Sequence, residues 1–313
     1  MKKVFIDGQE GTTGLQIYER LVGRDDIELL EIPHEKRKDQ KLKSEFLNNA
    51  NLVILCLPDQ AAIDSVALVN NPETKIIDAS TAFRTNPEWT YGLPEVNASQ
   101  RDKIIGSKRV SNPGCYPTGV ILSLAPLVSS EILDKEAMVS VNAVSGFSGG
   151  GKKLIALYEG SYKKQTEHYS VRPYALGKIH KHIDEMHLMT GLKKTPVFLP
   201  SVGNFYNGML ITIPLFKEHL NKDASSIHSL LKIHYKDEQF VEVKDLNSDE
   251  YLEDGFLSAT SLNGTNKVEI FVFDHDNAVL VLSRLDNLGK GASGAAVQNM
   301  NLMLELNEST SLT

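Results

Sequence analysis

Apolar runs alternate with helical patterns along the first third of the chain. Four runs predict buried strands, at residues 3–7, 27–32, 52–57 and 75–78. Apolar residues at helical spacing predict helices between them, at residues 15–22 and 61–69. Strands that alternate with helices indicate βαβ units and a parallel sheet. This part of the chain is therefore predicted to be a doubly wound domain.

The pattern changes after Cys115, where strands become more frequent than helices. Alternating runs predict strands at residues 138–144, 197–202, 209–214, 268–273 and 278–284. They suggest an antiparallel sheet packed on helices. A last helix is expected over 289–306, with small residues near its start that permit close packing. Two domains without a low-complexity linker suggest a cleft between them, where ligands commonly bind.

Composition and charge narrow the class of protein. The chain has 313 residues, is 41% apolar and 23% charged, and has a net charge of −7. A nucleic-acid partner is not expected, because phosphate backbones require a basic surface. No segment reaches the roughly 20 apolar residues of a membrane span, and the apolar start breaks at Asp7, too early for a signal peptide. Only Cys56 and Cys115 are available, so no disulfide framework or four-cysteine zinc site is expected, and a reducing, cytoplasmic location is predicted.

A glycine-rich turn links the first strand to the first helix. It contains Gly8, Gly11 and Gly14, and Thr12 and Thr13 stand at the predicted helix start. Glycines here allow a tight turn and a close approach to a pyrophosphate, which the free N–H groups of the helix can bind. The spacing differs from the commoner Gly-x-Gly-x-x-Gly, and a purely structural turn is the alternative. The position directly after the first strand favours a dinucleotide site.

The residues after the second strand bear on the choice of dinucleotide. Glu31 suits the ribose 2′-hydroxyl of NAD, whereas the cationic run that follows suits the 2′-phosphate of NADP. That run comprises His34, Lys36, Arg37 and Lys38. A solvated charge run at a helix start is the alternative. The cluster of cations favours NADP.

Cys115 stands between a turn and a predicted helix. Pro113 and Gly114 precede it, and an apolar helical run begins just after it. The dipole of a helix N-terminus stabilises a thiolate, so a nucleophilic cysteine is well placed there. Cys56 lies inside an apolar strand, which is typical of a buried core thiol.

Three further segments carry candidate chemistry. His180 and His182 can supply the acid–base partner of a thiolate, and Glu185 shares a face with His182 if a helix starts there. Ser145 and Gly146 open a glycine-rich loop after a strand, which forms a phosphate cradle, a loop over a substrate, or only a long turn. Arg84 follows the fourth strand at the ligand-binding edge of a parallel sheet and can pair with an anionic group. A solvated pair of histidines and a surface arginine are the plain alternatives.

Taken together, these motifs resemble the shorter type of the N-acetyl-gamma-glutamyl-phosphate reductases over nearly the whole chain. The most specific match is 111–119, and further matches lie at 78–84, 91–95, 145–152, 180–186 and 286–301. Asp184 stands where the family commonly has proline. The resemblance implies an α/β fold, with a Rossmann dinucleotide-binding domain (1–113 and 286–313) and an α+β catalytic and oligomerisation domain (114–285). This is the architecture of glyceraldehyde-phosphate and aspartate-semialdehyde dehydrogenases.

The resemblance also implies an activity, the NADPH-dependent reduction of N-acetyl-L-glutamyl 5-phosphate to the 5-semialdehyde in arginine biosynthesis. Cys115 would be the nucleophile and His180 or His182 the acid–base group, without a metal. Substrate contacts are expected from Arg84, Ser145, Gly146 and Glu185. Cofactor contacts are expected from the glycine turn, from Arg37 and Lys38, and from Pro58, Ser80, Gly291 and Asn299.

Two alternatives remain at this point. One is a related reductase of another acyl phosphate, such as an aspartate-semialdehyde dehydrogenase, which would use the same cysteine. The other is a sensor that binds NADPH without turnover. The expected partners are a small-molecule substrate and further copies of the chain, in a dimer or tetramer.

Overall fold

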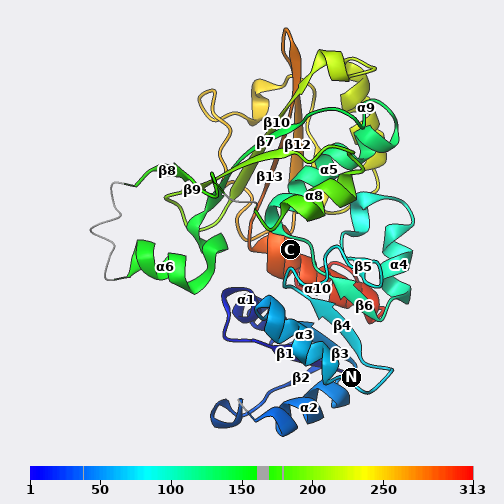
Figure 1. The fold of residues 1–313 in the computed structure, drawn as a ribbon, viewed down its shortest axis with the longest axis vertical. Helices are drawn as coiled ribbons and strands as arrows, with labels where there is room; N and C mark the ends of the chain where they lie inside the picture. The colour runs from blue at the N-terminus through cyan, green and yellow to red at the C-terminus, as the bar shows by residue number, and fades with distance from the viewer. Residues whose placement is uncertain (38, 161–168, 178–179, 313) are drawn as a thin grey trace. The chain divides into compact units, whose positions relative to one another are not determined.

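The chain folds into two units in this computed structural model, which describes residues 1–37, 39–160, 169–177 and 180–312 (Figure 1). The first unit comprises Met1–Pro94, Ala98–Gly114 and Ala292–Thr313. The second comprises Glu95–Asn97 and Cys115–Gly291. Each unit is therefore built from separate stretches of the chain. Lys38 of the predicted cofactor site lies outside the described residues.

The first unit is a parallel sheet in the order β2-β1-β3-β4-β6-β5. Its strands are β1 (Lys2–Asp7), β2 (Ile27–Leu30), β3 (Leu52–Leu55), β4 (Lys75–Asp78), β5 (Thr90–Tyr91) and β6 (Arg109–Ser111). Its helices are α1 (Thr12–Leu21), η1 (His34–Lys36), α2 (Gln40–Asn49), α3 (Asp59–Ala67), α4 (Gln100–Gly106) and α10 (Gly294–Met303). The predicted doubly wound domain is confirmed. Because strand order reverses between β1 and β3, their carboxyl ends form the switch point where ligands bind such sheets.

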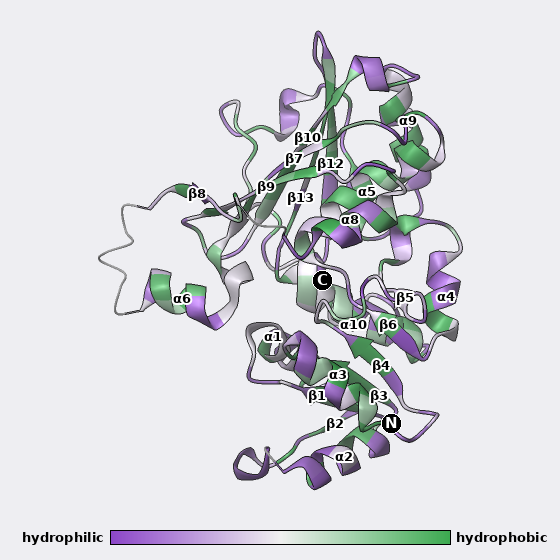
Figure 2. Cartoon of the chain, in the orientation of Figure 1, coloured by the Kyte–Doolittle hydropathy of each residue, from purple (hydrophilic) through white to green (hydrophobic). Residues whose placement is uncertain are grey.

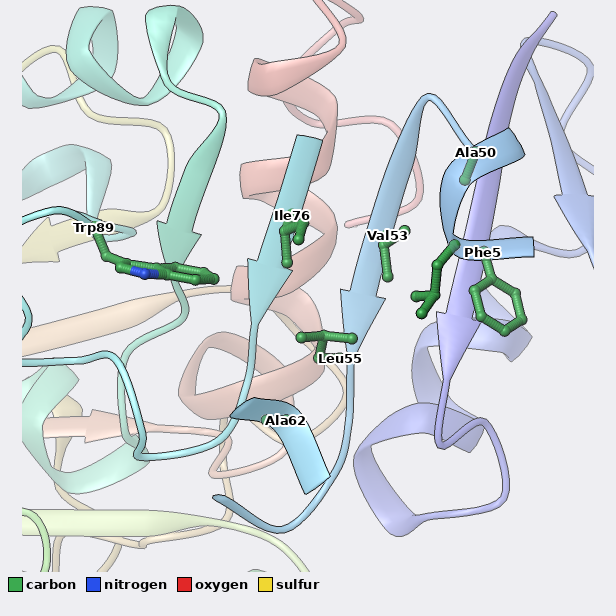
Figure 3. Packing of buried hydrophobic residues seen from close by; sticks show 8 residues of the cluster. Phe5, Ala50, Val53, Leu55, Ala62, Ile76 and Trp89 are labelled. Carbon is green, nitrogen blue, oxygen red and sulfur yellow. The ribbon is translucent and has the colours of Figure 1, made fainter. Parts of the chain in front are cut away.

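An apolar cluster joins the strands and helices of this sheet (Figure 3). Phe5, Val53 and Ile76 reach it from β1, β3 and β4. Leu47 of α2 and Ala62 of α3 complete it from the helices. Each of these five side chains is buried, and burial of this kind stabilises by roughly 25 cal/mol per Å² of apolar surface. This packing fixes the strand ends at which the candidate cofactor residues stand.

The second unit contains a seven-stranded sheet in the order β11-β12-β13-β10-β7-β9-β8. Its strands are β7 (Ser140–Gly146), β8 (Val171–Pro173), β9 (Val197–Gly203), β10 (Met209–Phe216), β11 (Val241–Val243), β12 (Val268–Asp274) and β13 (Ala278–Leu285). The prediction of an antiparallel sheet is wrong for two pairs, because β7 runs parallel to β9 and β11 parallel to β12. The long connection between β7 and β9 includes helices, and a crossover of that length allows parallel pairing.

Helices pack on this sheet at α5 (Cys115–Ser129) and α9 (Ala224–His234), and α8 (Ile183–Thr190) packs on α5. The remaining short elements are η3 (Phe147–Gly150), α6 (Gly151–Glu159), η4 (Lys217–His219) and η5 (Asp249–Tyr251). Strand β10 alternates between buried and half-buried residues, and its half-buried face carries Leu210. Val197 and Leu199 of β9 are exposed, so apolar side chains of this sheet reach the surface. The strands of this sheet are largely hydrophobic in sequence (Figure 2).

Two short elements span the boundaries between the units. They are η2 (Pro94–Val96) and a π-helix at Gly289–Ser293, which leads directly into α10. The long helix predicted over 289–306 therefore begins with a wide π turn and ends at Met303. A π turn inside a helix is rare and frequently accompanies a functional site.

Candidate active site

A cavity of about 440 Å³ in the second unit brings several of the predicted residues together. Its walls come from the start of α5, the end of β7, the turn η3, the region of β8 and the segment before α8. The lining residues are Cys115, Tyr116, Ser145, Gly146, Gly149, Gly150, Leu154, Arg172, Pro173, Tyr174, His180, Lys181, His182 and Val202. The predicted Cys115, Ser145, Gly146, His180 and His182 thus share one cavity.

Cys115 is the first residue of α5, as the sequence predicts. Its backbone N–H and those of the next residues are at the helix start, where the dipole stabilises a thiolate. Gly291 packs against it so closely that a Cβ at this glycine would lie 2.8 Å from Cβ of Cys115. The structure therefore places Gly291, which was predicted to bind the cofactor, directly against the candidate nucleophile.

Cys56 has a different environment from Cys115. It follows β3 in the first unit, and burial raises the pKa of its thiol well above the ordinary range, with Asp78 and Asp7 adding to the rise. A thiol in this state is a poor nucleophile, because the thiolate is the reactive form. Cys115 is therefore the better candidate for covalent chemistry.

His180 is held in a defined orientation. Its Nδ1 accepts a hydrogen bond from the backbone N–H of His182 at 3.2 Å, so the neutral ring carries its proton on Nε2. That Nε2 lies 3.4 Å from the hydroxyl of Tyr174. Burial lowers the pKa of His180 to about 4, and Lys181 adds to the shift. The ring is therefore neutral near pH 7 and able to donate from Nε2.

His182 and Glu185 begin the next helix. His182 is the N-cap of α8 and Glu185 lies in its first turn, so a helix does start at this point. Both side chains are buried. His182 lines the cavity, whereas Glu185 stands three residues further into the helix.

Ser145 and Gly146 form the end of β7, and both are buried. The hydroxyl of Ser145 donates to the carbonyl of Gly146 at 3.2 Å. A Cβ on Gly146 would lie 2.3 Å from the carbonyl oxygen of Tyr206, so only glycine fits between these backbones. The predicted glycine-rich loop thus lines the cavity through its backbone and one hydroxyl.

The cavity residues not predicted from the sequence include Arg172, Tyr174 and Lys181. The guanidinium of Arg172 donates to the hydroxyl of Tyr158 at 2.6 Å and stacks 3.8 Å from the ring centre of Tyr169. Burial raises the pKa of Tyr174 to about 12, so its hydroxyl stays protonated. The signal was a short Val-Arg-Pro-Tyr stretch just before the histidines. No carboxylate is among the described lining residues, so the cavity suits an anionic ligand.

The glycine turn of the first unit lies at the switch point of the parallel sheet. Gly8 has φ +89°, and a Cβ there would lie 2.4 Å from the carbonyl oxygen of Cys56. A Cβ on Gly14 would lie 2.3 Å from the carbonyl oxygen of Gly8. Gly11 is the N-cap of α1 without a side-chain cap, and Thr12 and Thr13 form the first turn. The free N–H groups of this helix start are therefore presented to an anion, as a pyrophosphate requires.

The neighbouring strand ends carry three other predicted residues. Pro58 is the N-cap of α3, directly after β3. Ser80 donates its hydroxyl to Asp78 at 2.7 Å, and burial raises the pKa of Asp78 to about 6. Arg84 donates from Nε to the carbonyl of Asn112 at 3.0 Å and from Nη2 to that of Ala79 at 3.3 Å.

Arg37 forms an ion pair with Glu10 of the glycine turn, and His34 contacts the same carboxylate at 3.2 Å. Glu31 is exposed and accepts a hydrogen bond from the hydroxyl of Tyr18 at 3.2 Å. Arg37, which is predicted to bind the 2′-phosphate, is therefore paired with a carboxylate of the glycine turn.

Asn299 of α10 is wholly buried. Its Nδ2 donates to the carbonyl of Gly92 at 2.9 Å and to Oδ1 of Asn112 at 3.2 Å. Its own Oδ1 has no donor among the described residues. A buried acceptor of this kind is costly unless a ligand or water satisfies it.

The described residues also bear on metal binding and on membrane crossing. No group of three or more His, Cys, Asp or Glu side chains within the described ranges is arranged to hold a metal ion. No helix in the described part of the chain is long and apolar enough to cross a membrane.

Comparisons with known proteins agree with this geometry. Residues 3–104 match the family model of the semialdehyde dehydrogenase NAD binding domain, and 115–287 match that of the semialdehyde dehydrogenase dimerisation domain. The fold resembles that of aspartate semialdehyde dehydrogenase II from Vibrio cholerae, with a TM-score of 0.75 and 16% identity over 97% of this chain and 99% of that one. The enzyme from Candida albicans, solved with NADP, gives a TM-score of 0.66 at 14% identity over 97% and 99%.

Closer relatives identify the family. N-acetyl-gamma-glutamyl-phosphate reductase 2 of Nostoc sp. is 50% identical over 99% of both chains. The N-acetyl-gamma-glutamyl-phosphate reductase of Allorhizobium ampelinum is 47% identical over 96% of this chain and 98% of its own. With a nicotinamide-dinucleotide fold in one unit and a cysteine cavity in the other, the chain belongs to the N-acetyl-gamma-glutamyl-phosphate reductase family of semialdehyde dehydrogenase-type oxidoreductases.

Proposed function

We propose that this protein reduces N-acetyl-L-glutamyl 5-phosphate to N-acetyl-L-glutamate 5-semialdehyde with NADPH and releases phosphate, as a step of arginine biosynthesis. The observation that carries the proposal is Cys115 at the start of α5, in one cavity with a neutral His180 and two cations. The names of its close relatives support the substrate.

The first step is attack by the Cys115 thiolate on the acyl-phosphate carbon. A carbon–sulfur bond forms, the bond between that carbon and the bridging phosphate oxygen breaks, and the departing phosphate takes up a proton. The product on the enzyme is a thioester. Backbone N–H groups at the start of α5 are suited to stabilise the oxyanion of the tetrahedral intermediate.

The second step reduces the thioester, and NADPH supplies the hydride when bound. His180, neutral and protonated on Nε2, donates a hydrogen bond to the oxygen on which negative charge develops. Collapse of the hemithioacetal then breaks the carbon–sulfur bond, releases the aldehyde and restores the Cys115 thiolate. We assign this hydrogen-bond-donating role to His180, with the backbone N–H of His182 orienting its ring.

Anionic parts of the substrate require cations. Arg172 and Lys181 line the cavity and are suited to the carboxylate and the phosphate of N-acetylglutamyl phosphate. Arg84, Ser145, Gly146 and Glu185 remain proposed substrate residues. Two nitrogens of Arg84 already donate to main-chain carbonyls, which holds its guanidinium in a fixed orientation.

The residues of the first unit fit a dinucleotide. The glycine turn at Gly8, Gly11 and Gly14 is suited to the pyrophosphate, and the buried Oδ1 of Asn299 is suited to an amide donor of the nicotinamide. We propose NADP as the cofactor, held at its 2′-phosphate by Arg37 and Lys38, with Pro58, Ser80 and Gly291 as further contacts. We accordingly assign 1–113 and 286–313 to cofactor binding and 114–285 to catalysis and oligomerisation.

We also propose that the protein is a homo-oligomer of the cytoplasm. The matched dimerisation model and the exposed apolar residues Val197 and Leu199 support a second copy on this part of the seven-stranded sheet. A reactive cysteine is best preserved in a reducing compartment.

A direct assay tests the proposed function. Phosphate-dependent oxidation of N-acetylglutamate semialdehyde is measured with NADP and NAD in parallel, and aspartate semialdehyde is the competing substrate. We expect turnover with the N-acetylated substrate and preference for NADP. Faster turnover of aspartate semialdehyde would contradict the proposal, and cofactor binding without any turnover would indicate a sensor.

A further inference from the structure

A buried ion pair joins two segments of the second unit that have no role in the chemistry described so far. Nζ of Lys290 lies 2.6 Å from Oε1 of Glu95, and neither side chain is exposed to solvent. Glu95 belongs to the Tyr-Gly-Leu-Pro-Glu motif and Lys290 to the Asp-Asn-Leu-Gly-Lys-Gly motif, 195 positions apart in the chain. Both motifs matched the family, yet neither charge has been given a function.

Two aromatic side chains lie near this pair. Nζ of Lys290 lies 5.5 Å from the ring centre of Phe240. Tyr235 is close enough that Glu95 contributes, after burial, to raising the pKa of its hydroxyl. Removing two charges from water is expensive, and such a pair contributes little or no net stability compared with apolar residues of the same size. Stability alone therefore gives a weak reason for its presence.

Lys290 stands in the π-helix Gly289–Ser293, where the backbone turn is wide. The glycines on either side of Lys290 pack closely against neighbouring residues. A Cβ at Gly289 would lie 2.1 Å from the carbonyl oxygen of Thr265, and one at Gly291 would lie 2.8 Å from Cβ of Cys115. Both neighbours of Lys290 are glycines. The side chain of Lys290 is therefore the one that ties this stretch of the turn to Glu95.

The segment that leads into this turn contacts the glycine-rich loop beside the cavity. Nδ2 of Asn287 donates to the hydroxyl of Ser148 at 2.9 Å, and Oδ1 of Asn287 accepts from the backbone N–H of Gly208 at 2.8 Å. Ser148 adjoins Gly149, which lines the cavity. The backbone N–H of Gly291 donates to the carbonyl of Asp286 at 3.0 Å and closes the turn. A shift of this turn would therefore move Cys115 and the glycine-rich loop relative to each other.

We propose that the Lys290–Glu95 ion pair is a positioning pair, which locks the π turn so that Gly291 holds Cys115 in its reactive orientation. The inference rests on the proposed role of Cys115 as the nucleophile. Neither charge contacts substrate in this account. Both act through the backbone of Gly291.

The test compares Glu95→Gln, Lys290→Met and the double variant E95Q/K290M. Each single change leaves one buried charge uncompensated, which lowers the melting temperature whatever the role of the pair. The double variant removes both charges at nearly constant size and is expected to melt close to the wild type. Its kcat is expected to fall at least tenfold, a larger factor than any rise in the Kd for NADPH, because Gly291 is only one of several proposed cofactor contacts.

A second readout does not require the substrate. The rate at which iodoacetamide alkylates Cys115 is followed by peptide mass spectrometry across pH, with the Cys56 peptide as an internal reference. The double variant is expected to alkylate at Cys115 at least fivefold more slowly or with a displaced pH profile. If the proposed function were wrong, the wild type would fail the substrate assay, but the alkylation comparison would still test the pair.

A control of similar burial is the pair Arg284–Glu269 in the second unit, with 2.6 Å between Nη2 and Oε2, whose carboxylate also lies 2.9 Å from Nζ of Lys244. Its double variant E269Q/R284M is expected to keep wild-type kcat and alkylation. The proposal is overturned if E95Q/K290M keeps kcat within twofold of wild type, or if the control variant loses as much. If E95Q/K290M does not fold, Glu95→Asp retains the charge but shortens the reach, and wild-type kcat and alkylation in that variant would equally overturn it.

Discussion

Backbone atoms form the proposed dinucleotide site at the edge of the six-stranded sheet, whereas side chains form much of the cavity around Cys115. In the first region, Gly8 and Gly14 approach carbonyl oxygens so closely that any side chain would overlap them. In the second, the thiol, imidazole and hydroxyl groups of Cys115, His180 and Tyr174 come from different elements. The first region therefore depends on the lack of a side chain at a few glycines. The second depends on which side chains come together. Substitutions should affect the two regions in separable ways, on cofactor binding in one and on turnover in the other.

The largest difference between the effect on turnover and the effect on cofactor binding is expected from Cys115→Ser. A hydroxyl is a far poorer nucleophile than a thiolate at neutral pH, so turnover should fall by several orders of magnitude. Binding of NADPH, followed by its fluorescence, should survive. Cys56→Ser is the matched control and should keep most of the catalytic rate. If Cys115→Ser kept more than about a tenth of the wild-type rate, a loss of only roughly 1.4 kcal/mol, the nucleophile would be elsewhere.

His180→Gln should reduce kcat by about 10²- to 10³-fold, the usual cost of losing one positioned hydrogen-bond donor to an oxyanion. The Kd for NADPH should stay close to wild type. A drop in cofactor binding as large as the drop in kcat would show instead that this histidine maintains the fold of both regions.

The lowered pKa of His180 gives a pH signature. Its folded pKa is about 4 and its ordinary value 6.5, so the unfolded chain binds more protons between these two pH values. Stability should therefore rise with pH across that window and gain nothing further from this group above it. Denaturant titrations at pH 4.5 and 7 should show a smaller difference in His180→Gln than in the wild type. An equal difference in both would mean that the imidazole is not held neutral.

Gly8→Ala tests the backbone site. The added Cβ would lie 2.4 Å from the carbonyl oxygen of Cys56, so the turn must move and the Kd for NADPH should rise at least tenfold. Gly23→Ala is the control, since Gly23 also has positive φ, +81°, but no atom within 4 Å of the new Cβ. Equal weakening by the two variants would attribute the effect to backbone strain alone. Alkylation of Cys115 should be unchanged in Gly8→Ala.

The smallest effects concern the choice of cofactor. Neutralising Arg37 and Lys38 together should raise the Kd for NADPH by about one to two decades, since a charge-assisted hydrogen bond contributes about 1.5–3 kcal/mol. Glu10→Gln should act in the opposite direction, because it frees Arg37 from its ion pair. An exposed pair contributes at most about 1 kcal/mol, so NADPH should bind up to about fivefold more tightly. Parallel changes in the Kd for NADH would show that these charges only form a solvated surface.

The same contrast explains what could be predicted from the sequence. The glycine turn is a continuous segment after a strong strand, and its position at the sheet edge follows from local patterning. The start of α5 at Cys115 was also predictable, since Pro113 and Gly114 end the preceding element. Arg172 and Tyr174 were not, because Arg172 lies in β8 and Tyr174 directly follows it, and this three-residue strand is too short for a periodic signal.

Pairings between distant segments also could not be predicted from the sequence. The parallel pairing of β7 with β9 depends on the path of the chain between them, and both strands alternate as antiparallel strands would. Glu10 lies between the glycines of the turn, and its ion pair with Arg37 joins two segments that are far apart in the sequence. The partners Lys290 and Glu95 are each surrounded by turn-forming residues, which predict exposure rather than complete burial.

The most direct test of the account is to trap the acyl-enzyme. The wild type is mixed with N-acetylglutamate semialdehyde and NADP in the absence of phosphate, so that the thioester forms but cannot be released to phosphate. We predict a burst of one NADPH per chain and an N-acetylglutamyl adduct on the peptide that contains Cys115, with neither in Cys115→Ser. A burst that persists in Cys115→Ser, or an adduct on any other residue, would contradict the central claim that Cys115 carries the substrate.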